Sequence, residues 1–165
     1  MVGRVYIPVS CFSYARGVVH EYPTLRVRLF NLAGEEFGVV ELGVDTGFEG
    51  SILLEREAYE FFAVGELPRE AWRRYRTLAG PLPVRTSRAI AELGGERVEV
   101  LVETPLYGGG KRLAGRELLN MIALVLDGPR REACVAHAEE GTRDTAGARA
   151  EPRRLRSPAE VGARG

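Results

Sequence analysis

Asp45 is the residue whose type and setting most clearly suggest chemistry. It follows the apolar segment Leu42-Gly43-Val44 and opens the turn Asp45-Thr46-Gly47. Only three of the acidic residues are Asp, at positions 45, 127 and 144, so a short carboxylate is rare in this chain. At the end of a strand, backbone N–H groups and the Thr hydroxyl can orient such a carboxylate for acid or base catalysis. The tripeptide alone is equally typical of an ordinary turn that ends a strand.

A second group of residues lies further along the chain. Leu113-Ala114-Gly115-Arg116 precedes a segment with helical character at 117–120. Glu49 stands four residues after Asp45, and Arg116 offers a planar guanidinium that binds a carboxylate through two hydrogen bonds. Taken alone, each of these two residues would be an ordinary surface charge.

These segments together resemble the retropepsin-like aspartic peptidases, the single-domain, half-pepsin family that includes retroviral proteases and prokaryotic relatives. Asp45-Thr46-Gly47 matches the catalytic tripeptide of the family, and Leu113–Arg116 matches its apolar, apolar, Gly, Arg motif. The resemblance covers the chain from about Val5 to Asp127. It implies an all-β half-barrel with one or two short helices. The family pairs an acid four residues after its catalytic Asp with the Arg of the second motif, as Glu49 and Arg116 stand here.

The implied activity is that of an aspartic endopeptidase working as a homodimer on a peptide or protein substrate. Each subunit would supply Asp45, while Thr46 and Gly47 fix its geometry and bridge the dimer. Glu49, Gly115 and Arg116 would support the structure and the dimer. The resemblance implies no cofactor.

Two further features bear on this interpretation. The family covers its substrate with a β-hairpin flap, and Leu78-Ala79-Gly80 is the candidate tip, although a Gly-Pro surface turn explains the same residues. Phe48 stands where the family usually has a small residue. A bulky side chain there would narrow the cleft, which keeps open a second function, that of a non-catalytic dimeric module that binds peptide or nucleic acid.

The elements that must position these residues are mostly strands. Residues 24–30 alternate apolar and basic, and with 37–44 they predict a hairpin ending at Asp45. Residues 85–92 and 97–102 predict a second hairpin around Gly94-Gly95. One short helix is predicted within 52–62, another at 117–120, and a closing strand at 121–126.

Composition limits the possible partners. Lys+Arg and Asp+Glu both number 23, so the net charge is zero and a general polyanion-binding protein is excluded. Trp72–Arg76 interleaves Arg with aromatics, but a solvated amphipathic stretch explains it better than nucleic-acid binding. Gly108–Arg112 lacks the first Gly and the Ser/Thr of a phosphate-binding loop. Nucleic acid and nucleotide are therefore not the expected ligands.

Domain limits and location follow from composition and length. Residues 1–128 form the expected peptidase domain, and 129–165, poor in Val and Leu and without aromatics, predict a disordered tail. Cys11, Cys134, His20 and His137 have no metal-ligand spacing and predict neither a metal site nor a disulfide framework. The longest apolar run, 121–126, is far shorter than the roughly 20 residues of a membrane span. We expect a cytoplasmic protein without a membrane partner.

Overall fold

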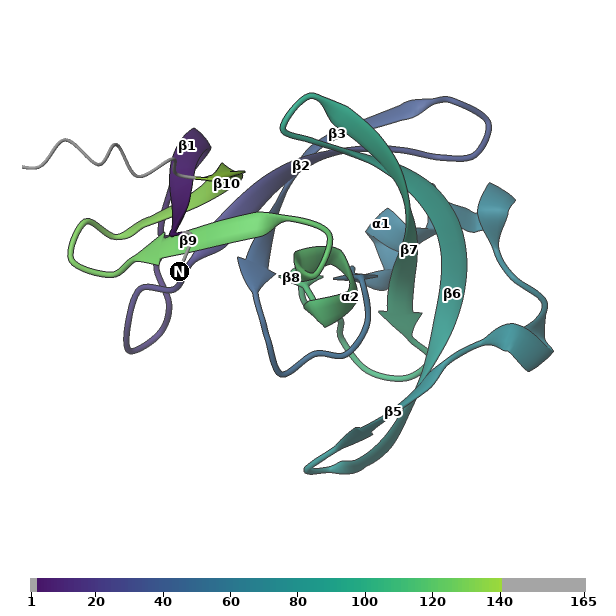
Figure 1. Cartoon of the computed structure of the whole chain (residues 1–165). Coiled ribbons are helices and arrows are strands. Elements are labelled where there is room, and N and C mark those ends of the chain that lie inside the picture. Colours follow the sequence, from purple (N-terminus) through teal and green to yellow (C-terminus); the bar gives the residue numbers. More distant parts are fainter. Residues whose placement is uncertain (1–2, 141–165) are drawn as a thin grey trace, which may run out of the picture.

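The structure is a computed structural model that describes residues 3–140. Its strands are β1 (Arg4–Ser13), β2 (Thr24–Phe30), β3 (Glu36–Val44), β4 (Ile52–Leu53), β5 (Arg74–Thr77), β6 (Gly80–Leu93), β7 (Glu96–Pro105), β8 (Leu113–Ala114), β9 (Ala123–Asp127) and β10 (Glu132–Glu140). The helices are α1 (Arg56–Glu60) and α2 (Arg116–Leu119), with 3-10 turns at Ala63–Gly65 and Arg69–Ala71. The predicted all-β class with short helices is therefore confirmed (Figure 1).

The strands form two sheets. The larger has seven strands in the order β2-β3-β8-β4-β7-β6-β5, and β6 also pairs with β2. Because of this extra pairing, a strand near one end of the order also contacts the strand at the other end, and the sheet curves around an apolar interior (Figure 1). The largest fully buried side chains include Tyr59, Phe62, Leu25, Leu29, Leu42, Ile52 and Leu54.

The β2–β3 hairpin shows why the chain folds this way locally. Leu25, Val27 and Leu29 are buried, whereas the alternating Arg26 and Arg28 are exposed. The register places Leu25 opposite Leu42 and Val27 opposite Val40, so both strands bury the same face. This hairpin is confirmed as predicted, and it delivers Asp45 directly after β3.

The second predicted hairpin, β6–β7, is also confirmed. Gly94 and Gly95 have φ values of 58° and 87°, a left-handed backbone that glycine adopts without strain. β6 is longer than predicted because it continues back to Gly80 and pairs with β5. The helix predicted within 52–62 covers only Arg56–Glu60, since Ile52 and Leu53 pair with β7 and β8.

The smaller sheet corrects the predicted tail. Its order is β1-β10-β9, so β10 is the middle strand and lies inside the segment 129–165 that was expected to be disordered. Ala133, Cys134, Val135 and Ala136 are buried there. The prediction of disorder is wrong for 132–140 because pairing on both sides satisfies the β10 backbone and small side chains suffice to fill the interior. Residues 141–165 lie outside the described part of the chain.

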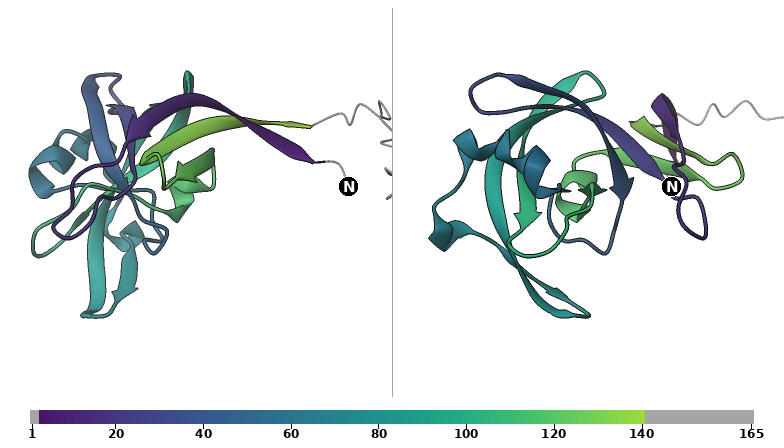
Figure 2. Two further views of the ribbon diagram at one scale, coloured as in Figure 1. Left: turned by 90° about the vertical axis from the view of Figure 1, so that its left-hand side faces the viewer. Right: turned by 180° about the vertical axis from the view of Figure 1, so that it is seen from behind.

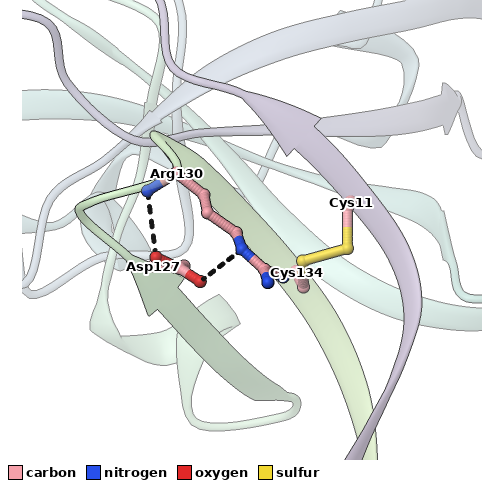
Figure 3. The surroundings of a disulfide bond; sticks show 4 residues. All are labelled: Cys11, Asp127, Arg130 and Cys134. Atoms are coloured by element: carbon pink, nitrogen blue, oxygen red, sulfur yellow. Dashed lines mark hydrogen bonds and ion pairs between the residues drawn. A yellow bond between two sulfur atoms is a disulfide. The ribbon is translucent and has the colours of Figure 1, made fainter.

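A disulfide joins Cys11 of β1 to Cys134 of β10 (Figure 3). The two residues are direct partners in the β1–β10 register and are 123 positions apart in sequence. The expectation that the cysteines form no disulfide is wrong, since only the pairing of these two strands brings them together. Such bonds are rare in a reducing cytosol, so this one weighs against the expected cytoplasmic location.

Within residues 3–140, no helix has the length and apolar character needed to cross a membrane.

Candidate active site

Asp45 lies immediately beyond the end of β3, half-buried, in a turn that orients its carboxylate. The backbone N–H groups of Gly47 and Phe48 donate to Oδ1 at 2.9 and 3.2 Å. The Asp45 N–H donates to the Ala114 carbonyl at 3.0 Å, which ties the turn to β8. Among the described residues, these bonds leave Oδ2 without a hydrogen-bond donor. The turn thus fixes the carboxylate through Oδ1, and Oδ2 remains available to another partner.

The turn depends on its small residues. A Cβ at Gly47 would lie 3.1 Å from Asp45 Oδ1, tight against the oriented oxygen. Thr46 and Gly47 are exposed, so this side of the turn faces solvent.

The second motif packs directly against this turn. The Arg116 N–H donates to the Phe48 carbonyl at 2.8 Å, and the Gly115 N–H donates to the Ser51 carbonyl at 2.8 Å. A Cβ at Gly115 would lie 2.2 Å from the Gly50 carbonyl oxygen, so no larger residue fits without movement of the backbone. The structure therefore brings the two sequence motifs together through main-chain hydrogen bonds.

Glu49 and Arg116 form an ion pair, with 2.7 Å between Oε1 and Nη2. Their side chains are 66% and 49% exposed in the single chain. The pair that the family resemblance implied is present, and it lies on the surface of the chain.

The candidate flap residues lie at the tip of the β5–β6 hairpin, which projects from the body (Figure 1). The Thr77 hydroxyl donates to the Gly80 carbonyl at 2.8 Å and accepts from the Ala79 N–H at 3.2 Å. Gly80 has a φ of 113°, a backbone conformation that glycine adopts at low cost and other residues rarely adopt. Leu78 is fully exposed. Among the described residues, no hydrogen bond or ion pair joins this tip to the Asp45 turn.

Phe48 points inward. Its ring meets that of Tyr75 edge-on, with centroids 5.3 Å apart, and it also packs on Gly50 and Gly115. The bulky residue after the Asp-Thr-Gly tripeptide is thus accommodated by two glycines and an aromatic partner.

A buried carboxyl below the Asp45 loop was missed in the sequence. Glu103 on β7 is fully buried, and the Tyr75 hydroxyl lies 2.7 and 2.9 Å from its two oxygens. Arg73 Nε lies 3.8 Å from Glu103, and the Arg73 guanidinium also pairs with Glu117 of α2. Burial raises the pKa of Glu103 to about 7, against the lowering effects of Tyr75 and Arg73. A single acid inside the otherwise uncharged stretch 100–106 was the available signal.

The same contacts explain the stretch Trp72–Arg76. Arg73 and Tyr75 turn inward to the buried cluster, while Arg74 and Arg76 are exposed. The Trp72 indole N–H donates to the Leu67 carbonyl at 3.0 Å. Trp72, Arg73 and Tyr75 are thus engaged in contacts within the chain.

An open cavity of about 840 Å³ adjoins the strands that lead to Asp45. Gly43 and Leu113, which are partners in the β3–β8 pairing, form part of its wall, and Tyr22 lies over Gly43. Arg16 and Lys111 also line it.

Some of the charged side chains around this cavity have ion-pair partners, and others do not. Arg112, a further lining residue, donates from Nε to Glu55 at 2.8 Å, and the lining Glu41 pairs with Arg26 at 3.6 Å. Within residues 3–140, Arg16 and Lys111 have no acidic side chain in ion-pair distance. The cavity therefore offers two positive charges to a ligand.

Comparison with solved structures finds similarity to aspartic proteases. EIAV protease in complex with the inhibitor HBY-793 is 13% identical, with a TM-score of 0.41, over 65% of this chain and 93% of that one. A retropepsin-like aspartic protease from Rickettsia conorii is 14% identical, with a TM-score of 0.49, over 84% of this chain and 95% of that one. No protein-family model matches the sequence, and no curated protein does.

Proposed function

We propose that this protein is an aspartic endopeptidase whose active unit is a homodimer. The observation that carries the proposal is the Asp45 turn, in which two backbone amides hold Oδ1 while Oδ2 accepts no hydrogen bond from the described residues. A carboxylate fixed at a strand end and packed on a Gly-Arg motif is suited to acid–base work on a peptide carbonyl.

The chemistry requires two such carboxylates. Asp45-Thr46-Gly47 occurs once in the sequence. Asp127 is used elsewhere, since its Oδ1 accepts the Arg130 N–H at 3.0 Å in the β9–β10 turn (Figure 3). Asp144 lies outside the described residues. A second copy of Asp45, from a second chain, is the proposed partner, and the exposed Thr46 would bridge the two turns.

Two Asp45 carboxyls held close together would share one proton, because two like charges at short range cannot both ionise. The ionised one takes a proton from a water molecule, whose oxygen attacks the peptide carbonyl carbon. The protonated one donates to the carbonyl oxygen as the tetrahedral intermediate forms. Collapse of the intermediate then breaks the C–N bond. The leaving nitrogen takes the proton that the first carboxyl received from water, and a hydroxyl of the intermediate returns its proton to the second carboxylate, which restores the starting state.

The projecting β1–β10 arm supplies a surface for the second copy (Figure 2). β1 is an edge strand of its sheet, and Val5, Tyr6, Ile7 and Val9 are 44–53% exposed on it. An edge strand with apolar side chains is a template for pairing with another chain.

The cavity beside β3 and β8 is the proposed binding place for a substrate side chain next to the scissile bond. Because Arg16 and Lys111 line it, the favoured side chain is acidic.

Incubation with a mixed peptide library over a range of pH tests the proposal, with Asp45→Asn as the matched variant. We expect cleavage by the wild-type protein and none by the variant. The Asn side-chain oxygen can accept the same amide hydrogen bonds, so stability should change by no more than about 0.5 kcal/mol. Cleavage by the purified variant would refute the assignment. Peptide binding without cleavage by the wild type would favour the non-catalytic binding module.

A further inference from the structure

Glu103 is a buried carboxyl that touches three separate parts of the candidate site. It lies on β7. The residues paired with it on the two adjacent strands, Leu53 of β4 and Thr86 of β6, carry no charge. The charged and titratable groups that face it are Tyr75 and Arg73, from the start of the β5–β6 hairpin, and Glu117 from α2.

The loop that follows Asp45 lies against this carboxyl at the point where the Tyr75 hydroxyl also meets it. A Cβ at Gly50 would lie 2.1 Å from Glu103 Oε2, so the carboxyl packs directly on the glycine backbone. The backbone amide of Ser51 also faces it. Glu103, the Tyr75 hydroxyl and Gly50 therefore meet at one point, where a Cβ at Gly50 would also lie 2.7 Å from the Tyr75 hydroxyl. Both Glu103 oxygens lie within hydrogen-bond distance of that hydroxyl.

The geometry points to Glu103 as a positioning residue, a latch that holds the base of the β5–β6 hairpin against the loop carrying Asp45. Tyr75 contributes both a hydrogen bond to the latch and an edge-on contact with Phe48, which lies three residues after Asp45. Arg73 extends the contact to Glu117, next to Arg116. That this hairpin covers a substrate rests on the proposed function, but the latch itself does not.

The latch is sensitive to pH because burial dominates the electrostatics of Glu103. Desolvation raises its pKa to about 7, Tyr75 and Arg73 lower it, and Glu117 raises it. Lifting the hairpin would remove Tyr75 and Arg73 and admit water, so the pKa of Glu103 would fall towards its ordinary value near 4.5. The closed hairpin thus binds the proton more tightly than the open one. By linkage, the closed state is favoured at low pH and loses this advantage as the pH rises through about 7.

The neighbouring groups do not reverse this sign. Burial raises the pKa of Tyr75, which stays neutral over this range, and hydrogen bonding to Glu117 raises that of Arg73, which stays positive. Ionisation of Glu103 is therefore the change that we expect to loosen the hairpin.

Amide hydrogen exchange of residues 74–80 tests the latch without any need for substrate. After correction for the intrinsic exchange rate, we expect protection in the wild type to fall about tenfold or more from about pH 5 to about pH 8, since each unit of pKa difference is a factor of ten. Glu103→Gln keeps the hydrogen-bonding shape without the titration, so its hairpin should show no such dependence. Tyr75→Phe should lower protection at the acid end.

The matched control is Glu99→Gln, which removes an exposed carboxylate on the same strand that pairs with Arg88. It should behave as the wild type does. The strands β2 and β3 report global stability, so a loss confined to 74–80 separates hairpin opening from unfolding. The same pH dependence in Glu103→Gln as in the wild type, or unchanged protection in Tyr75→Phe, would overturn the latch. If no peptide is cleaved, the proposed function fails while the exchange result still decides the latch.

Discussion

At the scale of single residues, the contacts that each side chain already makes determine which of its groups remain available for chemistry or binding. Asp45 uses one carboxylate oxygen to hold its turn. Gly115 admits the Gly50 carbonyl at a distance that no side chain would allow. Phe48 packs on Tyr75 and so belongs to the support of the turn. Within residues 3–140, Arg16 and Lys111 have no acidic side chain in ion-pair distance, and their charges are the ones proposed to bind an acidic ligand.

Substrate preference is tested at Lys111. Between peptides that differ only by Glu or Gln beside the scissile bond, the wild type should favour the Glu peptide in kcat/KM. Lys111→Glu should remove or reverse this preference by a few-fold, since an exposed charge pair is worth at most about 1 kcal/mol. Lys111→Arg, which keeps the charge, is the control and should retain the preference. Equal kcat/KM for both peptides in the wild type would contradict the acidic subsite.

The Glu49–Arg116 pair should contribute little to the stability of a single subunit. Both side chains are about half exposed or more, so Arg116→Ala should lower the free energy of unfolding by less than about 1 kcal/mol. Arg88→Ala, which breaks the similarly exposed pair with Glu99, is the matched control. Chemical denaturation at low protein concentration measures both. A loss of 3–5 kcal/mol, typical of a broken buried pair, would show that the pair is covered in the folded protein.

At the scale of elements, the small sheet decides where the folded domain ends. β10 lies between β1 and β9, and Val135 belongs to the main apolar core. The limit at residue 128, drawn from composition, therefore cuts between two paired strands. The β5–β6 hairpin differs, because among the described residues its tip is hydrogen-bonded only within its own turn, while Tyr75 joins its base to Glu103.

A chain that ends at Gly128 should be markedly less stable than the full chain. It loses the middle strand of the sheet and the disulfide, and a disulfide typically contributes about 2–4 kcal/mol to stability. The double variant Cys11→Ser/Cys134→Ser keeps the strand and isolates the share of the disulfide. Thermal and denaturant unfolding under oxidising conditions compare the three chains. An unchanged Tm in the shortened chain would restore the boundary at 128.

At the scale of the whole molecule, the proposal requires two chains. Each subunit provides one oriented carboxylate and one apolar edge strand in β1. A symmetric pair uses the same surface of both subunits, so the two Asp45 turns and the two β1 strands would meet across one axis.

Mixed dimers test this assembly. Co-refolding wild type with an excess of Asp45→Asn should reduce activity roughly as the square of the wild-type fraction, because only wild-type pairs hold two carboxylates. The control adds Val5→Lys and Ile7→Lys to Asp45→Asn, which puts charges on the edge strand and should only dilute the signal in proportion. A linear loss with Asp45→Asn itself, or full activity in a chain that sediments as a monomer, would refute the shared site.

The sequence by itself determined the features that arise from neighbouring residues. Apolar alternation in 24–30, the Gly94-Gly95 turn and the strand leading to Asp45 all depend on side-chain period and turn chemistry within a few positions. The meeting of the Asp-Thr-Gly and Gly-Arg motifs was expected only through the family resemblance, and the hydrogen bond from Arg116 to Phe48 now gives it a physical basis.

The tertiary structure alone decided the features that depend on which distant segments become neighbours. β10 is a strand because β1 and β9 pair with it, and Cys134 finds Cys11 only through that register. Glu103 becomes a buried carboxyl because Tyr75 and Gly50 come together over it. None of these outcomes follows from local propensity, since each requires partners tens of residues away whose positions are set by the register of the sheets.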